Sequence, residues 1–304
     1  MTITVAIPTI GRSSLGATLA SVAQQTRQAD QIVIVNQGDP GGRSWVPAEL
    51  ESRLTWIDDD GRGLSRARNR ILTEVQSEWC YWIDDDEEAE PANLERLEEI
   101  ATVFPDLAFV GGSYLAPLDL PPDAICPVLY PHGDVLVDAD SWGTTQAFGV
   151  VDVWGGNVAY RRDLREKVGL YDLSLGAGTE RFPRGEDTDY NVRALSAGFR
   201  GMLTARMPIL HTFGARKPTG REREYDVQTS AVLAWKSRQD PLTVNPELAA
   251  RLHSYGRKKS VVSRLTGGLV FADEQVSAKL YADFTQQLDR DFVLKDGVLI
   301  AKTT

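Results

Sequence analysis

The chain has 304 residues and a formal net charge of −10 at pH 7. This length allows one large α/β domain with a tail or two modest domains. The acidic balance, without a long face rich in lysine and arginine, argues against a nucleic-acid partner, because such binding depends on neutralising phosphates.

No segment reaches the roughly 18 uncharged residues that a membrane-spanning helix needs, and Met1 is not followed by the pattern of a secretory leader. We therefore expect a cytoplasmic protein. The two cysteines, Cys80 and Cys126, form neither a metal-ligand pattern nor a disulfide framework, so we expect reduced thiols.

Apolar runs alternate with helical periods through the first half of the chain. Short apolar runs predict strands at residues 2–7, 32–35, 54–57, 79–83 and 107–110. Between them, apolar residues at helical spacing predict helices that begin near Ser13 or Ser14, near Leu64 and near Pro91. This alternation predicts a parallel sheet with helices on both faces.

The second half has a less regular pattern. Residues 113–150 are rich in Pro, Gly and Asp, and we expect a long excursion over the ligand-binding edge of the sheet. A strand ending near Trp154, helices at 161–167 and 186–196, and a strand at 202–205 are predicted to complete a core over residues 1–221. Residues 222–304 form a mainly helical C-terminal extension in this prediction, with a hairpin at 292–301.

Three consecutive aspartates, Asp84, Asp85 and Asp86, directly follow the apolar run at 79–83. Adjacent carboxylates repel one another unless a cation neutralises them, so this cluster at the end of a buried strand indicates a divalent metal. In open α/β sheets, ligands also bind at this edge. The simpler alternative is that the aspartates are solvated or cap the following helix.

Other strand ends and helix starts carry further polar groups that suit a nucleotide. The polar groups are Thr9 and Arg12 after Pro8, Asn36 and Asp39 after the second strand, and Arg66 and Arg68 after a glycine-containing loop. Such a loop at a helix start suits a phosphate, because backbone N–H groups converge there. Each group taken alone also fits a polar turn or a solvated basic face.

The order of these motifs resembles that of the family 2 inverting glycosyltransferases with the GT-A fold, over residues 2–211. The motifs that carry the resemblance are Ile7-Pro8-Thr9, the strand end at 36–39, the helix entry at 63–69, the Asp84-Asp85-Asp86 form of the DxD motif, Gly155-Gly156-Asn157, and Gly185-Glu186-Asp187. The resemblance implies an α/β fold with a Rossmann-like, mostly parallel sheet flanked by helices. It also implies a nucleotide-sugar-binding half at about 1–112 and an acceptor-side half at about 113–221.

The resemblance implies a metal-dependent transfer of a sugar from a nucleoside-diphosphate sugar to a hydroxyl of a glycan, lipid-linked or small-molecule acceptor. Asp86 and His211 would ligate Mn²⁺ or Mg²⁺, with Asp86 ranked first among the three aspartates. The residues implied in donor binding are Pro8, Thr9, Arg12, Asn36, Asp39, Arg66, Arg68, Asp84 and Asp85.

The resemblance places the general base at Asp187, with Glu186 as its neighbour, and the acceptor side at Trp154, Gly155, Gly156 and Asn157. Inversion requires one base that removes the proton of the acceptor hydroxyl while its oxygen attacks. An aspartate at a helix start is also a common capping residue, and a lone histidine such as His211 is often structural.

Two other functions share parts of this pattern. A nucleotidyltransferase would also combine nucleotide, metal and an acidic strand end, but such enzymes typically open with a glycine-rich basic loop, whereas the segment at 8–12 is short. A non-catalytic binding module is disfavoured because both the aspartate triplet and Asp187 are present.

The extension carries a basic run within an acidic chain. Its cations are Arg251, Arg257, Lys258, Lys259 and Arg264, interleaved with apolar residues. Such a segment fits peripheral contact with an anionic membrane at its cytoplasmic face, where a lipid-linked acceptor would lie. The alternative is a helix packed on the catalytic domain or on a second subunit of a homo-oligomer.

Overall fold

A computed structural model of the chain provides the fold. It describes residues 1–115, 131, 133–142, 145–146, 149–150, 153–179, 181–211, 228, 231–233, 235–236, 274–295 and 298–302. The basic run at 251–264, Cys126, most of the excursion at 113–150 and the hairpin turn at 296–297 lie outside these residues.

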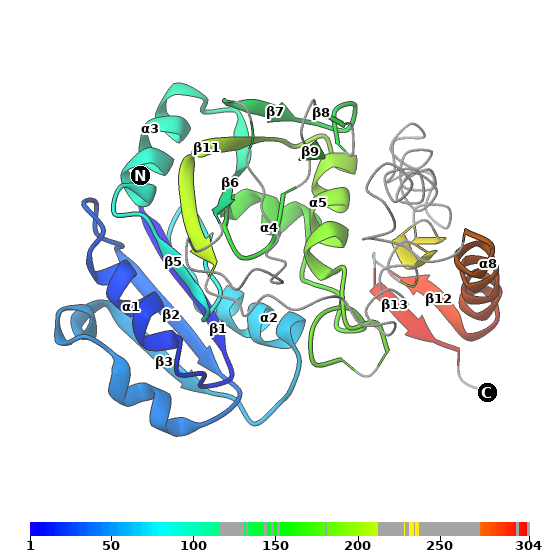
Figure 1. The fold of residues 1–304 in the computed structure, drawn as a ribbon, viewed down its shortest axis with the longest axis horizontal. Coiled ribbons are helices and arrows are strands. Elements are labelled where there is room, and N and C mark those ends of the chain that lie inside the picture. Colours follow the sequence, from blue (N-terminus) through cyan, green and yellow to red (C-terminus); the bar gives the residue numbers. More distant parts are fainter. Residues whose placement is uncertain are drawn as a thin grey trace.

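A nine-stranded sheet forms the centre of the molecule (Figure 1). Its strands follow the order β3 (Leu54–Asp58), β2 (Gln31–Asn36), β1 (Ile3–Thr9), β4 (Trp79–Trp82), β10 (Val158–Arg161), β6 (Leu107–Leu115), β11 (Arg200–His211) and β5 (Glu87–Ala89), and β7 (Val135–Val137) pairs with β11. The neighbours from β3 to β4 pair in parallel, as do β6 and β11. β10 runs antiparallel between β4 and β6. The predicted mostly parallel α/β sheet is therefore confirmed.

Two groups of helices flank this sheet. Just after α1 (Leu15–Ala23), the Thr26 hydroxyl donates to Glu95 in α3 (Asn93–Val103) at 2.9 Å, so the end of α1 lies near the start of α3. The second group contains α2 (Leu64–Glu74), α4 (Arg162–Val168) and α5 (Glu186–Ser196), with Arg165 donating to the carbonyl of Leu72. Right-handed crossovers lead from β1 to β2 through α1 and from β3 to β4 through α2, in opposite directions along the sheet, so α1 and α2 cover opposite faces.

Burial on both faces explains why the central strands are continuous apolar runs. All seven residues of β1 are buried, and so are all four of β4. Because β1, β2 and β4 are parallel, their carboxyl ends meet at one edge of the sheet. This edge is where the polar motifs of the sequence come together.

Trp154 belongs to neither a helix nor a strand. The predicted strand ending near it overlaps β9 (Gly149–Val150), which pairs with β8 (Thr145–Gln146) outside the main sheet, and residues 151–152 lie outside the described part of the chain. The sequence analysis did not predict β10, which begins at Val158, shortly after Gly155 and Gly156. The sequence prediction also lacked the short edge strands β5 and β7 and the full length of β11.

The described part of the C-terminal extension contains helix α8 (Glu274–Asp291) and a hairpin of β12 (Phe292–Lys295) and β13 (Val298–Ala301), beside α5 (Figure 1). The predicted hairpin is confirmed by antiparallel pairing of these strands. A second apolar cluster joins them to the segment before α5; its buried members are Leu175, Phe182, Val232, Trp235, Leu288, Phe292 and Leu299. In the part of the chain that the structure describes, no helix is long and apolar enough to cross a bilayer.

Candidate active site

Asp85 connects the end of β4 to the loop after β1. Its Oδ2 accepts a hydrogen bond of 2.6 Å from the hydroxyl of Thr9 and one of 3.3 Å from the backbone N–H of Ile10. Arg12 Nη1 donates to Asp85 Oδ1 at 3.2 Å and to Asp86 Oδ2 at 2.7 Å. Asp85 is thus engaged by protein groups, and it holds the β1 loop in position beside the other two aspartates.

The flanking aspartates, Asp84 and Asp86, each lie close to an arginine. Asp84 Oδ1 lies 3.6 Å from Arg68 Nη2, and the Asp84 side chain is 32% exposed. Burial raises the pKa of Asp84, an effect that Arg68 opposes and neighbouring carboxylates reinforce. Burial also raises the pKa of Asp86, against the charge of Arg12. A cation at this edge would relieve the repulsion among these carboxylates.

Arg68 is the buried cation that joins the two halves of the site. It projects from α2 and is 1% exposed. Its Nη1 donates to Glu186 Oε1 at 3.2 Å, and its guanidinium lies 5.8 Å from the ring of Trp82 and 5.5 Å from that of Tyr171. The sequence predicted Arg68 at a phosphate-binding helix start, but the structure places it among protein carboxylates and aromatic rings instead.

Glu186 and Asp187 open α5 on the other side of Arg68. Asp187 Oδ2 accepts from the backbone N–H of Gly155 at 3.0 Å, and its Oδ1 accepts from that of Thr188 at 2.7 Å. The Asp187 side chain is half-buried. Burial and the neighbouring Asp187 raise the pKa of Glu186 to about 7, against the opposing charge of Arg68. The helix N-terminus therefore presents two carboxyl groups in different environments.

The glycines before β10 pack directly against these charged groups. A Cβ atom on Gly155 would lie 2.8 Å from Arg68 Nη2 and 2.9 Å from Asp187 Cβ. A Cβ atom on Gly156 would lie 2.3 Å from Glu87 Oε1. A Cβ atom at either position would require these neighbours to shift, and the segment predicted on the acceptor side lies beside Asp187.

The two residues that flank the glycines have different environments. The half-buried ring of Trp154 lies 4.9 Å from that of Tyr114. Asn157 is 0% exposed, accepts from the Tyr81 hydroxyl at 2.7 Å, and donates to the carbonyls of Ser113 at 3.0 Å and Met207 at 2.8 Å. Its amide therefore connects strands inside the core, and its side chain does not face an acceptor.

The residues predicted after β2 and in α2 lie farther along the same edge. Asn36 is buried, donates to Asp58 at 3.0 Å and accepts from Gly38 at 3.1 Å, so it orders the loop after β2. Asp39 is exposed and caps a short 3-10 helix, η1 (Pro40–Trp45). Arg66 is exposed and pairs with Asp59 at 3.0 Å, which lowers the pKa of Asp59.

His211 ends β11 within the electrostatic reach of the aspartate triplet. Its Nε2 lies 4.0 Å from Glu87 Oε1, and burial lowers the pKa of His211 despite the opposing charge of Asp84. A neutral imidazole is the form that ligates metals. Asp86 and His211 thus have suitable chemistry for Mn²⁺ or Mg²⁺.

The described residues contain no group of three or more His, Cys, Asp or Glu side chains arranged to hold a metal. Magnesium sites in phosphate chemistry often use one or two carboxylates together with substrate phosphates and water. The residues at this edge therefore fit a metal whose coordination a diphosphate completes.

The sequence analysis missed two residues of the site, Glu87 and Tyr114. Buried Glu87 accepts from the backbone N–H of Asp84 at 2.8 Å, and burial together with the charge of Asp84 raises the pKa of Glu87. Tyr114, near the end of β6, is 4% exposed, and its hydroxyl has no hydrogen-bond partner among the residues that the structure describes. Glu87 directly follows the triplet, so its position was a usable signal, whereas Tyr114 looks like an ordinary strand residue.

Comparison with known sequences identifies relatives. The profile of the family described as Glycosyl transferase family 2 matches residues 4–127. A glucosyl-dolichyl phosphate glucuronosyltransferase of Haloferax volcanii is 26% identical over 187 residues, which cover 59% of this chain and 58% of that protein. Glycosyltransferase GlyA of Streptococcus pneumoniae is 30% identical over 117 residues, which cover 37% of this chain and 17% of that protein. The chain thus spans less than two thirds of the length of either relative.

Solved structures share the fold at low sequence identity. A mannosyltransferase from Pyrobaculum calidifontis, in complex with GDP-Man and Mn²⁺, matches with a TM-score of 0.56 at 16% identity, over 93% of this chain and 83% of that one. S. aureus TarS matches with a TM-score of 0.56 at 12% identity, over 83% of this chain and 41% of that one. Residues 1–349 of TarS in complex with UDP match with a TM-score of 0.52 at 12% identity, over 99% and 96% of the two chains. These matches show a GT-A-like α/β fold.

Proposed function

Because the chain belongs to glycosyl transferase family 2, we propose that it transfers a sugar from a nucleoside-diphosphate sugar to an acceptor hydroxyl, with inversion at the anomeric carbon. The observation that carries this proposal is the polar network around Arg68. This one buried cation contacts Asp84 at the end of β4 and Glu186 at the start of α5. The network thus joins a donor side and an acceptor side at one edge of the sheet.

The donor side lies along the carboxyl ends of β1, β2 and β4. The loops ordered by Asp85 and Asn36 would receive the nucleoside, and the half-exposed side chain of Arg12 would face the phosphates. Asp86 and His211 would hold Mn²⁺ or Mg²⁺, which when bound neutralises the charge that grows on the departing diphosphate. Asp84 would contact the ribose or sugar.

Asp187 has the geometry of a general base. Two backbone N–H groups, those of Gly155 and Thr188, fix its carboxylate at the start of α5. In the proposed step the acceptor oxygen bonds to the anomeric carbon as the carbon–oxygen bond to the diphosphate breaks. The acceptor proton passes to Asp187, so no covalent enzyme intermediate forms.

The proposed acceptor is a hydroxyl on a lipid-linked glycan. The Haloferax volcanii relative is named for a glucosyl-dolichyl phosphate substrate, and its similarity covers 59% of this chain. Gly155 and Gly156 leave no side chain between the backbone and the groups around Asp187, which would allow a sugar to approach closely. The half-buried Trp154 would offer an apolar surface beside them.

A panel of nucleotide sugars tests this function. Each is added with Mn²⁺, and thermal stabilisation identifies the donor, because a specific ligand raises apparent stability by mass action. The matching donor should then release nucleoside diphosphate in the presence of a lipid-linked or glycan acceptor. Release of pyrophosphate would instead indicate nucleotidyl transfer, and binding without turnover would indicate a non-catalytic module.

Replacing the proposed base provides the sharper test. Asp187→Asn should retain donor binding but lose about 10²- to 10⁴-fold in turnover, the range of a general base. Asp106→Asn, the same change at an exposed carboxylate that pairs with Arg200, serves as the matched control. Near-normal turnover of Asp187→Asn at saturating acceptor would reject Asp187 as the base and leave Glu186 as the next residue to replace.

A further inference from the structure

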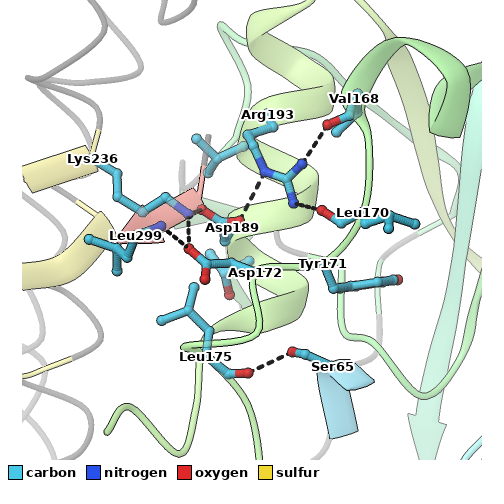
Figure 2. Close-up of polar contacts among 12 residues, drawn as sticks. Ser65, Val168, Leu170, Tyr171, Asp172, Leu175, Asp189, Arg193, Lys236 and Leu299 are labelled. Carbon is cyan, nitrogen blue, oxygen red and sulfur yellow. Dashed lines mark hydrogen bonds and ion pairs between the residues drawn. The ribbon is translucent and has the colours of Figure 1, made fainter. Parts of the chain in front are cut away.

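Four charged side chains form a buried ion cluster between α5 and the C-terminal extension (Figure 2): Asp172, Asp189, Arg193 and Lys236. Lys236 Nζ lies 2.9 Å from Asp172 Oδ2 and 2.5 Å from Asp189 Oδ1. Arg193 Nε lies 2.9 Å from Asp189 Oδ2. Both carboxylate side chains are at most 3% exposed and that of Lys236 is 7% exposed, so water does little to screen these charges.

The extension supplies half of the positive charge of this cluster. Arg193 belongs to α5 and also donates to the carbonyls of Val168 at 2.6 Å and Leu170 at 2.9 Å. Lys236 belongs to the extension, and so does Leu299, whose backbone N–H donates to Asp172 Oδ2 at 3.0 Å. The negative charges of Asp172 and Asp189 are therefore balanced by two cations only when the extension packs against α5 and brings Lys236 to them.

Removing Lys236 would leave two buried carboxylates with Arg193 alone. Burial raises the pKa of Asp189, but the charges of Lys236 and Arg193 outweigh that effect and lower the pKa below its ordinary value. A buried charge without a partner of opposite sign strongly destabilises the folded structure around it. The local structure would therefore shift to bring water to Asp172 or Asp189.

Both carboxylates adjoin the proposed active site. Asp189 lies two residues after Asp187 in the first turn of α5. Asp172 directly follows Tyr171, whose ring stacks on that of Tyr190 at 4.3 Å and lies 5.5 Å from the guanidinium of Arg68. A shift of either carboxylate would thus move groups on the acceptor side.

We propose that Lys236 is a positioning residue of the transferase. By bridging Asp172 and Asp189, it holds the first turn of α5, and with it Asp187, in the geometry needed for the acceptor. This inference rests on the proposed function of Asp187. In this proposal the C-terminal extension supports the acceptor side of the site, whereas donor binding depends on residues at the edge of the sheet.

The test uses three variants of the full chain. Lys236→Met removes the charge while keeping most of the side-chain volume. Lys236→Met with Asp172→Asn removes one charge of each sign, so Asp189 and Arg193 remain as a balanced pair. Lys302→Met is the matched control, because Lys302 is an exposed cation of the extension that donates to the carbonyl of Asp289.

Lys236→Met should lower kcat by about 10²-fold, the scale expected when a catalytic group is misplaced by about 1 Å. The dissociation constants of UDP and GDP with Mn²⁺ should stay unchanged. The double variant should recover at least about tenfold in kcat, because coupled charges give non-additive effects. Equal kcat for Lys236→Met and Lys302→Met, a matching loss of nucleotide binding, or no recovery in the double variant would overturn the proposal.

Amide hydrogen exchange separates this inference from the proposed function. In the ligand-free protein, the amides at the start of α5 should exchange faster in Lys236→Met than in the native chain, and those of β1 should not change. Lys302→Met should show neither change. Unchanged exchange in α5 would refute the positioning role, whereas a native chain without turnover on any donor would refute the proposed function and leave the exchange result intact.

Discussion

Three adjacent aspartates at the end of β4 have three different environments. Asp85 accepts hydrogen bonds from Thr9 and from the β1 loop and is 5% exposed. Asp86 pairs with Arg12, and Asp84 faces the buried guanidinium of Arg68 at 3.6 Å. Identical side chains thus acquire separate environments, because the chain turns at Asp85 and Asp86 and each aspartate meets different neighbours.

The effect of Mn²⁺ on nucleotide binding should depend on Asp86. Asp86→Ala should abolish the effect of Mn²⁺ on nucleotide binding, because it removes the carboxylate that we assign to the metal, while Asp85 keeps the β1 loop in place. Calorimetry with UDP and GDP, with and without Mn²⁺, measures this. Asp106→Ala, which removes an exposed carboxylate paired with Arg200, should bind as the native chain does. A full Mn²⁺ effect in Asp86→Ala would remove Asp86 from the metal site.

Glu186 should make folding stability depend on pH. Its pKa is raised from 4.5 to about 7, chiefly by burial, so the folded chain binds this proton more tightly than the unfolded chain. The contribution of Glu186 to the free energy of unfolding is fully present below the pKa that Glu186 has in the unfolded chain. This contribution is lost as the pH rises through about 7. A shift of this size corresponds to something on the order of 3 kcal/mol.

Glu186→Gln mimics the protonated form, so its thermal midpoint should exceed that of the native chain at pH 8 and match it near pH 5. Glu51→Gln is a control of opposite sign, because Arg43 lowers the pKa of Glu51. If Glu186→Gln proved less stable at every pH, the ion pair with Arg68 would outweigh the cost of burial.

At the scale of elements, the site depends on how closely three segments approach one another. The loop before β10 lies against α2 through Arg68 and against α5 through Asp187. β10 itself runs antiparallel between β4 and β6, which brings this loop to the edge where β4 ends. The backbone of Gly155 therefore sets the distance between the donor and acceptor sides.

Gly155→Ala should separate these segments. Its Cβ atom would lie 2.8 Å from Arg68 Nη2, so the chain must move at a cost of about 1–3 kcal/mol. Turnover should fall along with stability, which chemical denaturation and donor turnover would measure. Gly16→Ala in α1 is the control and should stabilise by about 1 kcal/mol, because its Cβ meets no atom closer than 3.8 Å. A Gly155→Ala chain with native stability and turnover would show that the loop before β10 accommodates a Cβ atom without displacing its neighbours.

On the scale of the whole molecule, the extension is built into the catalytic core. Leu175 and Phe182 from the core segment share an apolar cluster with Trp235, Phe292 and Leu299 of the extension. The buried ion cluster around Lys236 lies beside that apolar cluster (Figure 2). The predicted division near residues 221 and 222 thus separates chain segments that share one interior.

The basic run at 251–264 predicts binding to an anionic membrane surface, where each nearby cation contributes about 1 kcal/mol. The chain should cosediment with vesicles rich in anionic lipid at low salt, and about 0.5 M salt should release it by screening. Replacing Arg257, Lys258 and Lys259 with Ser should remove binding without changing donor hydrolysis. Equal binding to neutral vesicles, or none to either, would leave this run as a packing or subunit contact.

The amino-acid sequence by itself determined most of the elements and the groups that we propose to react. Apolar runs and helical periods placed most strands and helices, such as α5 at residues 186–196, because burial on one or two faces leaves a local pattern. The same local reading found the aspartate triplet and the carboxylates that open α5, since strand ends and helix starts have their own residue preferences.

Only the tertiary structure decided which of these groups meet. Arg68 pairs with Glu186 across 118 positions, and Lys236 pairs with Asp172 across 64. The burial of Arg68, the inward direction of Asn157 and the close approach of Gly155 follow from the packing of separate layers. The local sequence does not indicate such pairings. A charged residue has the same local pattern whether it lies in solvent or in a buried cluster, and only the packing of the surrounding elements decides between the two.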